Sequence, residues 1–235
     1  GVVEVPAEVP TIQEAIDASS DGDTVLVAAG TYVENVVISG KDIALIGEDR
    51  ETTIIDGDSS GSVVYFGSNA GMDTYFSGFT VQNGIGQAIN SGTHNNHNCG
   101  GGIVIGYSAS PLLTDLIVQN NTVDGAGGGI FVEDNAQLRL SNSIIRNNTA
   151  GHAEPGGGIQ IDGGSGSFIH NVEVHDNFAA GKGLVYNTGE RVMGYTSPLF
   201  VSLMALLKSL LPEIETALLL HNMNLTFFAL LALLI

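Results

Sequence analysis

The stretch "GAGGGIFVEDNAQLRLSNSIIRNNTA", residues 125–150, decides the fold because it is one of three copies of the same phrase. The copy before it is "CGGGIVIGYSASPLLTDLIVQNNTV" (99–123), and the copy after it is "PGGGIQIDGGSGSFIHNVEVHDNFA" (155–179). Alignment on the glycine triplets places three isoleucines in one column, with spacings of 27 and 29 residues: Ile103, Ile130 and Ile159. The chain is therefore built, in part, from a repeat.

A second column of the alignment gives the same two spacings and consists of Asn120, Asn147 and Asp176. A weaker fourth copy, "SGFTVQNG" (77–84), matches the second half of the phrase, and residues 85–98 are then expected to form an inserted loop.

Each copy contains two short runs of alternating polar and apolar residues, punctuated by glycine and asparagine, which is typical of strands. So short a strand cannot bury its apolar face alone, whereas stacked copies bury a continuous core. No stretch between residues 24 and 176 keeps a helical spacing of apolar residues for long. We therefore predict a parallel β-helix with about 4.8 Å between coils.

The polar columns fit the corners of such coils. Asparagine tolerates left-handed backbone geometry and can hydrogen-bond to equivalent residues above and below. We expect this role for Asp115, Asn142 and Asn171 and for the column of Asn120, Asn147 and Asp176. Asn120 and Asn147 each also begin an Asn-Asn-Thr sequon, so N-glycosylation is the alternative for these two residues.

The N-terminal segment "PTIQEAIDAS" (10–19) predicts a short capping helix. Thr11 and Glu14 have the spacing of a capping box, and Ile12, Ala15 and Ile16 share one face. Such a helix would cover the open end of the solenoid.

The segment "VPTIQEAIDASSDGDTVLVAAGTYVENVVISGKDIALIG" (9–47) resembles the opening of right-handed parallel β-helix proteins of the pectin-lyase-like superfamily. The resemblance covers residues 1–176 and implies the fold more than the function, because this superfamily includes lyases, hydrolases, esterases, epimerases and adhesins. Its enzyme signatures are absent from this sequence: a basic residue beside calcium-binding aspartates, a Gly-His-Gly step and an Asp-Phe-Ile-Phe-Gly run.

The formal charge of −18 lies entirely in residues 1–176, which hold 22 acidic and four basic residues. So acidic a body repels nucleic acid and anionic lipid and favours cations or neutral partners. The single cysteine, Cys99, allows no intrachain disulfide.

Two further columns of the repeat alignment contain residues that could catalyse a reaction or bind a ligand. Glu133 and Asp162 occupy the same position of adjacent coils, so their carboxylates are candidates for an acid/base pair in glycoside cleavage. With Asp134 they are also candidate calcium ligands. The alternative is a set of solvated acids at turns.

The other column reads Gln82, Gln119, Arg146 and His175. Gln119, Arg146 and His175 would project outward as a polar stripe suited to sugar hydroxyls, and an ordinary solvated face is the alternative.

The repeat stops near residue 180, and the composition from Pro198 onward becomes rich in leucine and alanine. We expect apolar helices there, either associated with a membrane or packed as a cap on the solenoid. The phrase "GLVYNTGERVMGYTSPL" (183–199) resembles a segment of multi-spanning membrane glycosyltransferases. The catalytic acids of that family precede this segment, in the region that the repeat occupies here, so the resemblance does not imply glycosyl transfer.

The sequence thus predicts an all-β fold: a right-handed parallel β-helix over residues 1–180 with a short N-terminal capping helix. An apolar, membrane-associating or end-capping helical tail follows over residues 181–235. The expected function is that of an extracytoplasmic, non-catalytic module that binds glycan or calcium or forms a surface element. The alternatives are a polysaccharide lyase or glycoside hydrolase, and a fragment of a membrane glycosyltransferase fused to a β-helix.

Overall fold

In the computed structural model, residues 1–68, 70–89, 97–151, 156–162 and 166–179 are described, together with the backbone of residues 185–187 and 190–191. The predicted helical tail from Pro198 onward lies outside the described residues. Among those that are described, no helix is long and apolar enough to cross a membrane.

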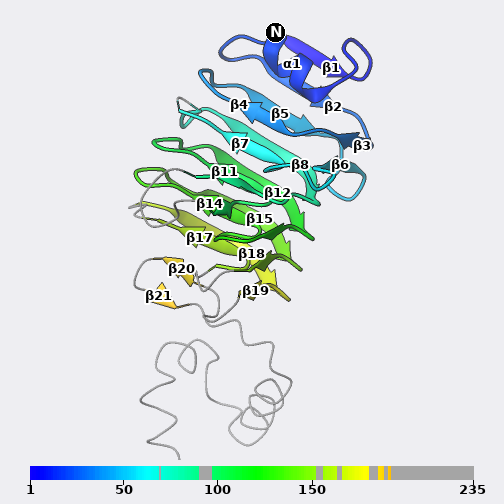
Figure 1. Cartoon of the computed structure of the whole chain (residues 1–235). Coiled ribbons are helices and arrows are strands. Elements are labelled where there is room, and N and C mark those ends of the chain that lie inside the picture. The colour runs from blue at the N-terminus through cyan, green and yellow to red at the C-terminus, as the bar shows by residue number, and fades with distance from the viewer. Residues whose placement is uncertain are drawn as a thin grey trace, which may run out of the picture. The chain divides into compact units, whose positions relative to one another are not determined.

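The chain coils into stacked rungs whose strands form three parallel sheets (Figure 1). Sheet 1 consists of β1 (Val2–Val5), β2 (Thr24–Val27), β3 (Gly30–Val33), β5 (Ala44–Gly47), β6 (Thr53–Asp56), β8 (Tyr75–Gln82), β12 (Leu112–Gln119), β15 (Arg139–Arg146) and β18 (Phe168–His175). Sheet 2 consists of β4 (Val36–Ile38), β7 (Val64–Phe66), β11 (Ile103–Ile105), β14 (Ile130–Val132) and β17 (Ile159–Ile161). Sheet 3 consists of β13 (Thr122–Val123), β16 (Thr149–Ala150) and β19 (Phe178–Ala179).

The register of the sheets confirms the alignment of the repeats. Ile103 pairs with Ile130, which pairs with Ile159, across three strands of sheet 2. The fourth copy is also confirmed, because β8 pairs in register with β12. The expected loop over residues 85–98 contains a short antiparallel pair, formed by β9 (Gln87–Ala88) and β10 (Asn98–Cys99).

The predicted capping helix, α1 (Ile12–Ala18), lies at the N-terminal end of the stack (Figure 1). The Glu14 N–H donates to Thr11 Oγ1 at 3.2 Å, which is one of the two hydrogen bonds of a capping box, and Ile12 is fully buried. No sequence pattern indicated a second cap. The Glu34 carboxylate accepts the N–H groups of Ile12 and Gln13 at 3.0 Å each. It thereby binds otherwise unpaired donors at the positive end of the helix.

The glycine triplets are explained by the distance between coils. A Cβ on Gly101 would lie 2.6 Å from the carbonyl oxygen of Gly128, and one on Gly128 would lie 2.5 Å from that of Gly157. The first glycine of each triplet has positive φ, for example +66° at Gly127. The first position of the triplet thus requires a positive φ, and the second leaves no space for a Cβ. Glycine meets both requirements, which explains why the triplet recurs in each copy.

In the Asn-Asn pairs, the corner and the ladder are formed by two different residues, whereas Asn142 and Asn171 have positive φ and also bond to each other. The first asparagine of each Asn-Asn pair turns the corner: φ is +56° at Asn120 and +55° at Asn147. The second is fully buried and forms the ladder, in which Asn121 Nδ2 donates to Asn148 Oδ1 at 2.9 Å. Asn148 Nδ2 donates in turn to Asn177 Oδ1 at 2.9 Å. The prediction of corner geometry was right, but the prediction that Asn120 and Asn147 form the ladder was wrong by one residue.

The main core fills the interior between the sheets, and Phe76 stacks on Phe79 with ring centroids 4.8 Å apart. A second apolar cluster covers the outer face of sheet 2 and includes Cys99, Val104 and Phe131. The outer face of sheet 2 is therefore partly covered, whereas sheet 1 presents polar side chains outward.

Strand structure continues beyond the last full coil. β20 (Val185–Asn187) lies beside β17 and pairs in antiparallel fashion with β21 (Glu190–Arg191).

Candidate functional site

The predicted polar stripe exists on the outer face of sheet 1. Gln82, Gln119, Arg146 and His175 are register partners at the ends of β8, β12, β15 and β18. The preceding residues of the first three strands, Val81, Val118 and Ile145, are buried in the core. Because side chains alternate along a strand, the stripe faces outward as predicted.

Three of the four stripe residues, Gln82, Gln119 and Arg146, are linked by a chain of hydrogen bonds that ends on Asp56. Arg146 Nε and Nη2 donate to Gln119 Oε1 at 3.0 and 2.8 Å. Gln119 Nε2 donates to Gln82 Oε1 at 3.1 Å, and Gln82 Nε2 donates to Asp56 Oδ2 at 2.9 Å. We call these four residues, Asp56, Gln82, Gln119 and Arg146, the amide ladder. In each of its hydrogen bonds the donor lies on the Arg146 side and the acceptor on the Asp56 side.

Asp56 terminates the amide ladder at its N-terminal end. Burial alone would raise the pKa of Asp56, but hydrogen bonds from the Asp58 N–H, Gln82 and Asn83 outweigh it and lower the pKa below its ordinary value. The carboxylate is therefore ionised and accepts the end of the ladder. At the other end, His175 is the register partner of Arg146 and bonds to Asp176, with 2.8 Å between His175 Nδ1 and Asp176 Oδ2.

The sequence did not predict this pairing of the stripe with itself. Each amide uses its oxygen and one N–H within the ladder, and its NH₂ group has a second donor hydrogen. The ladder thus fixes the orientation of the amides and keeps part of their hydrogen-bonding capacity for a ligand.

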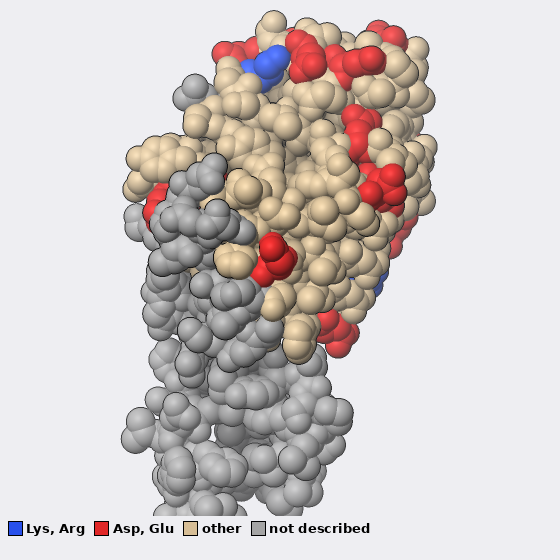
Figure 2. All heavy atoms as spheres, viewed as in Figure 1, with Lys and Arg blue, Asp and Glu red and all other residues tan. Residues whose placement is uncertain are grey.

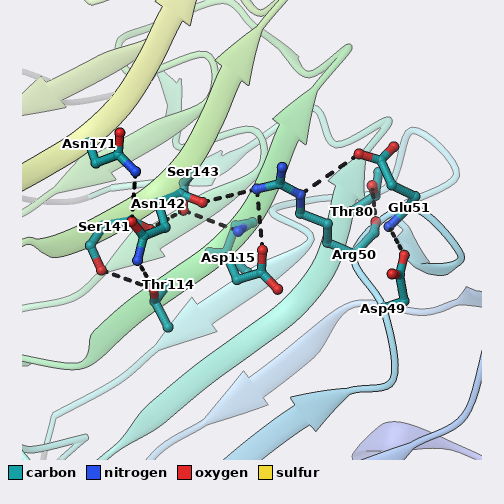
Figure 3. Close-up of polar contacts among 11 residues, drawn as sticks. Asp49, Arg50, Glu51, Thr80, Thr114, Asp115, Ser141, Asn142, Ser143 and Asn171 are labelled. Atoms are coloured by element: carbon teal, nitrogen blue, oxygen red, sulfur yellow. Dashed lines mark hydrogen bonds and ion pairs between the residues drawn. The ribbon is translucent and has the colours of Figure 1, made fainter.

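A second polar cluster lies at the corner that β12, β15 and β18 turn in their middle, where Asp115, Asn142 and Asn171 have positive φ (Figure 3). Ser141 Oγ donates to Thr114 Oγ1 at 2.9 Å, and Asn171 Nδ2 donates to Asn142 Oδ1 at 2.8 Å. Arg50, from the loop between β5 and β6, reaches across the rungs and donates from Nη1 to the Asn142 carbonyl oxygen at 3.0 Å. No sequence pattern indicated that Arg50 would reach this face.

The predicted pair of acids lies at the ends of two strands of sheet 2. The Glu133 N–H donates to the Ile105 oxygen and the Asp162 N–H donates to the Val132 oxygen, each at 2.9 Å. The two residues therefore follow β14 and β17 in equivalent positions, as their column requires. Gln160 Nε2 donates to Asp162 Oδ1 at 2.7 Å and orients that carboxylate.

Glu133 is half-buried beside tyrosines. Burial raises the pKa of Glu133, and the charges of Asp134 and Asp162 raise it further, although the Tyr107 N–H bond at 3.0 Å opposes them. Burial and the Glu133 charge also raise the pKa of Tyr65. A carboxyl group that holds its proton more tightly than usual can act as a general acid.

The predicted calcium ligands do not assemble into a site of three. Within the part of the chain that the structure describes, no three His, Cys, Asp or Glu side chains form a group that could hold a metal ion. Glu133, Asp134 and Asp162 all lie in that part. Exposed Asp134 follows Glu133 directly, and its effect there is electrostatic. Calcium binding by the protein remains a prediction.

The family model named "Right handed beta helix region" matches residues 77–196, which is half of the chain. The chain belongs to this family. The β-helix therefore has the predicted hand. The match extends through residue 196 and so includes the first part of the segment that resembles membrane glycosyltransferases, a resemblance that the match does not support. No curated protein matches the sequence.

Solved structures similar to this β-helix protein include several pectin methylesterases. One, crystallised in complex with a hexasaccharide, has 16% identity and a TM-score of 0.44, over 77% of this chain and 66% of that chain. PemA from Erwinia chrysanthemi has 15% identity and a TM-score of 0.39, over 63% and 55%. The enzyme from Aspergillus niger has 14% identity and a TM-score of 0.32, over 83% and 90%. The chain thus spans slightly less than two thirds of the first of these structures and about half of the second.

Proposed function

We propose that this β-helix protein is an extracytoplasmic module that binds an extended polysaccharide along the outer face of sheet 1. The observation that carries the proposal is the amide ladder, which presents oriented hydrogen-bonding groups on successive rungs. Rungs repeat about every 4.8 Å. A linear chain of sugars offers hydroxyl groups at a comparable repeat, so each rung can contact one sugar residue.

The geometry favours a polymer over a small ligand. Ligand pockets enclose small molecules on most sides, whereas this face is a row of half-buried and exposed side chains with one element per rung. Because the amides are held by their neighbours, binding does not require them to be ordered first, which lowers the entropic cost of association.

The test is affinity electrophoresis of the full chain through gels that contain one polysaccharide each. Retardation in at least one gel is expected. His175→Ala should reduce the retardation, since His175 is exposed at the end of the stripe and its bond to Asp176 is local. The control is Val37→Ala, which changes an exposed residue on the outer face of sheet 2. Migration unchanged in every gel, or equal loss in both variants, would refute the proposal.

A second function is favoured by Glu133. Its raised pKa and its position one rung from Asp162 suit a general acid beside a second carboxyl group, as in glycoside hydrolysis. Incubation of the full chain with the polysaccharides should then release new reducing ends, and Glu133→Gln and Asp162→Asn should each abolish the release. Release that both variants retain would exclude these residues. If calcium takes part in binding, removal of calcium with a chelator should weaken the binding of the protein to polysaccharide.

The composition of residues 181–235 concerns the location of the protein relative to a membrane. We propose that this apolar segment associates with a membrane or covers an end of the solenoid, consistent with its composition. Partition of the full chain into lipid vesicles, compared with a variant that carries Leu→Glu changes at Leu219 and Leu230, distinguishes the two.

A further inference from the structure

Most of the described basic side chains of the solenoid lie on the outer surface of sheet 1. Among the residues whose side chains the structure describes, the lysines and arginines are Lys41, Arg50, Arg139 and Arg146. Arg139 and Arg146 begin and end β15 in sheet 1, and Arg50 crosses the same face. In the view of Figure 2, acidic side chains far outnumber basic ones. Three of the four described basic side chains of a strongly acidic protein therefore lie on the outer surface of sheet 1, with Arg139 before and Arg146 after the corner at Asn142.

Lys41, the fourth, has a structural task elsewhere. Its Nζ donates to the carbonyl oxygens of Ile16 and Ser19 at 2.9 and 2.7 Å, at the C-terminal end of α1. A cation at the end of a helix binds unpaired carbonyls and complements the helix dipole. No comparable task accounts for the charge of the arginines of β15.

Arg139 and Arg146 are held by neutral groups only. Arg139 Nη1 donates to the carbonyl oxygen of Met72 at 2.9 Å and to that of Ser110 at 3.4 Å, and Arg146 donates to Gln119. Neither forms an ion pair with a described carboxylate. Arg50, in contrast, pairs with Asp115 at 3.2 Å and Glu51 at 3.7 Å. The arginines of β15 thus keep their charge for another partner.

The aromatic neighbour of Arg139 suits a sugar ring. Phe168, the register partner of Arg139, is 60% exposed and stacks on His170, with ring centroids 6.1 Å apart. Aromatic rings offer a flat apolar surface for the faces of sugars. The two arginines are seven positions apart on one rung, and the corner at Asn142, where φ is +49°, lies between them. They therefore mark two separate contact positions on the outer surface of sheet 1.

We infer that the polymer bound by this face carries negative charge, as carboxylate or sulfate groups, and that Arg139 and Arg146 bind these groups. The inference rests on the proposed function and names the charge of its ligand. Arginine matches both groups because its planar fork donates two parallel hydrogen bonds to adjacent oxygens.

The experiment compares polymers that share a backbone and differ in charge: carboxymethyl cellulose with hydroxyethyl cellulose, and dextran sulfate with dextran. The full chain is run through gels that contain each polymer. Stronger retardation by the charged member of a pair is expected, and the pair that shows it distinguishes carboxylate from sulfate. Arg139→Gln and Arg146→Gln should each weaken that retardation about fivefold, the upper range for a partly exposed ion pair.

Lys41→Gln is the matched control, since it removes the same charge away from the face and should leave retardation unchanged. Arg146→Lys keeps the charge and should retain part of the binding. Equal retardation by the charged and neutral members would overturn the inference but preserve the proposed function. An equal loss in Lys41→Gln and the arginine variants would also overturn it, because net charge alone would then explain the effect. Retardation by none of the polymers would overturn both.

Discussion

Arg50 Nη1 lies 3.2 Å from Asp115 Oδ1, although one residue belongs to a loop before β6 and the other to β12 (Figure 3). The same nitrogen donates to the Asn142 carbonyl oxygen on β15, and Thr80 Oγ1 on β8 donates to the Arg50 carbonyl oxygen. One residue thus connects three consecutive rungs across the outer face of sheet 1.

This arginine bridge is expected to contribute little to stability through its charge. Arg50 is 28% exposed and Asp115 is 53% exposed, and exposed pairs contribute below about 1 kcal/mol. A double-mutant cycle of Arg50→Gln and Asp115→Asn, measured by denaturant unfolding, should give a coupling of that size that decreases in high salt. A coupling above about 2 kcal/mol would show that the bridge organises the rungs.

The buried asparagine ladder should be far more sensitive. Asn148→Ala leaves the Asn121 N–H and Nδ2 without their acceptor in the core, and each unsatisfied group costs about 1–3 kcal/mol. We expect a loss of about 3 kcal/mol or more in the free energy of unfolding. Asn147→Gly is the control, because Asn147 is exposed with φ of +55° and glycine adopts that geometry freely. Equal losses would contradict the division of tasks between the two columns.

The glycine triplet offers a test of the distance between coils. Gly128→Ala places a methyl group 2.5 Å from the Gly157 carbonyl oxygen, so the rungs must separate, with an expected loss of about 3 kcal/mol. Gly40→Ala serves as comparison, since Gly40 has φ of +75° but no atom within 4 Å of an added Cβ. It should lose only the strain of about 1 kcal/mol. A larger loss in Gly40→Ala than in Gly128→Ala would show that backbone strain, not contact, explains the triplets.

The burial of Glu133 predicts a dependence of stability on pH. Because the pKa of Glu133 is raised on folding, the folded state binds this proton more tightly than the unfolded state. The contribution of Glu133 to stability is therefore fully present below its ordinary pKa and is lost as the pH rises through the folded pKa. Glu133→Gln should raise the midpoint of thermal unfolding at pH 7 relative to the unchanged protein and have no such effect at pH 3. Asp73→Asn, at an exposed turn, should shift neither midpoint, and a rise at both pH values in Glu133→Gln would contradict the predicted cause.

The parts of the fold that recur on every rung could be predicted from sequence. Ile103, Ile130 and Ile159 are spaced by whole coils, so spacing alone fixes their register. Contacts between coils of different length could not be predicted in this way. Arg50 and Glu34 act across loops whose paths no pattern encodes. The pairing of Gln119 with Gln82 and Arg146 also escaped prediction, because a column shows that side chains lie together but not which atoms they share.

The one-way order of the amide ladder has a consequence for how such a chain can lengthen. A duplicated coil inserted next to β12 would bring another glutamine, whose amide can accept from one neighbour and donate to the other without any further change. A duplicated β15 coil would instead place two arginines side by side, with donors facing donors. Growth by gene duplication is therefore compatible with the middle of this solenoid and is opposed at its arginine rung.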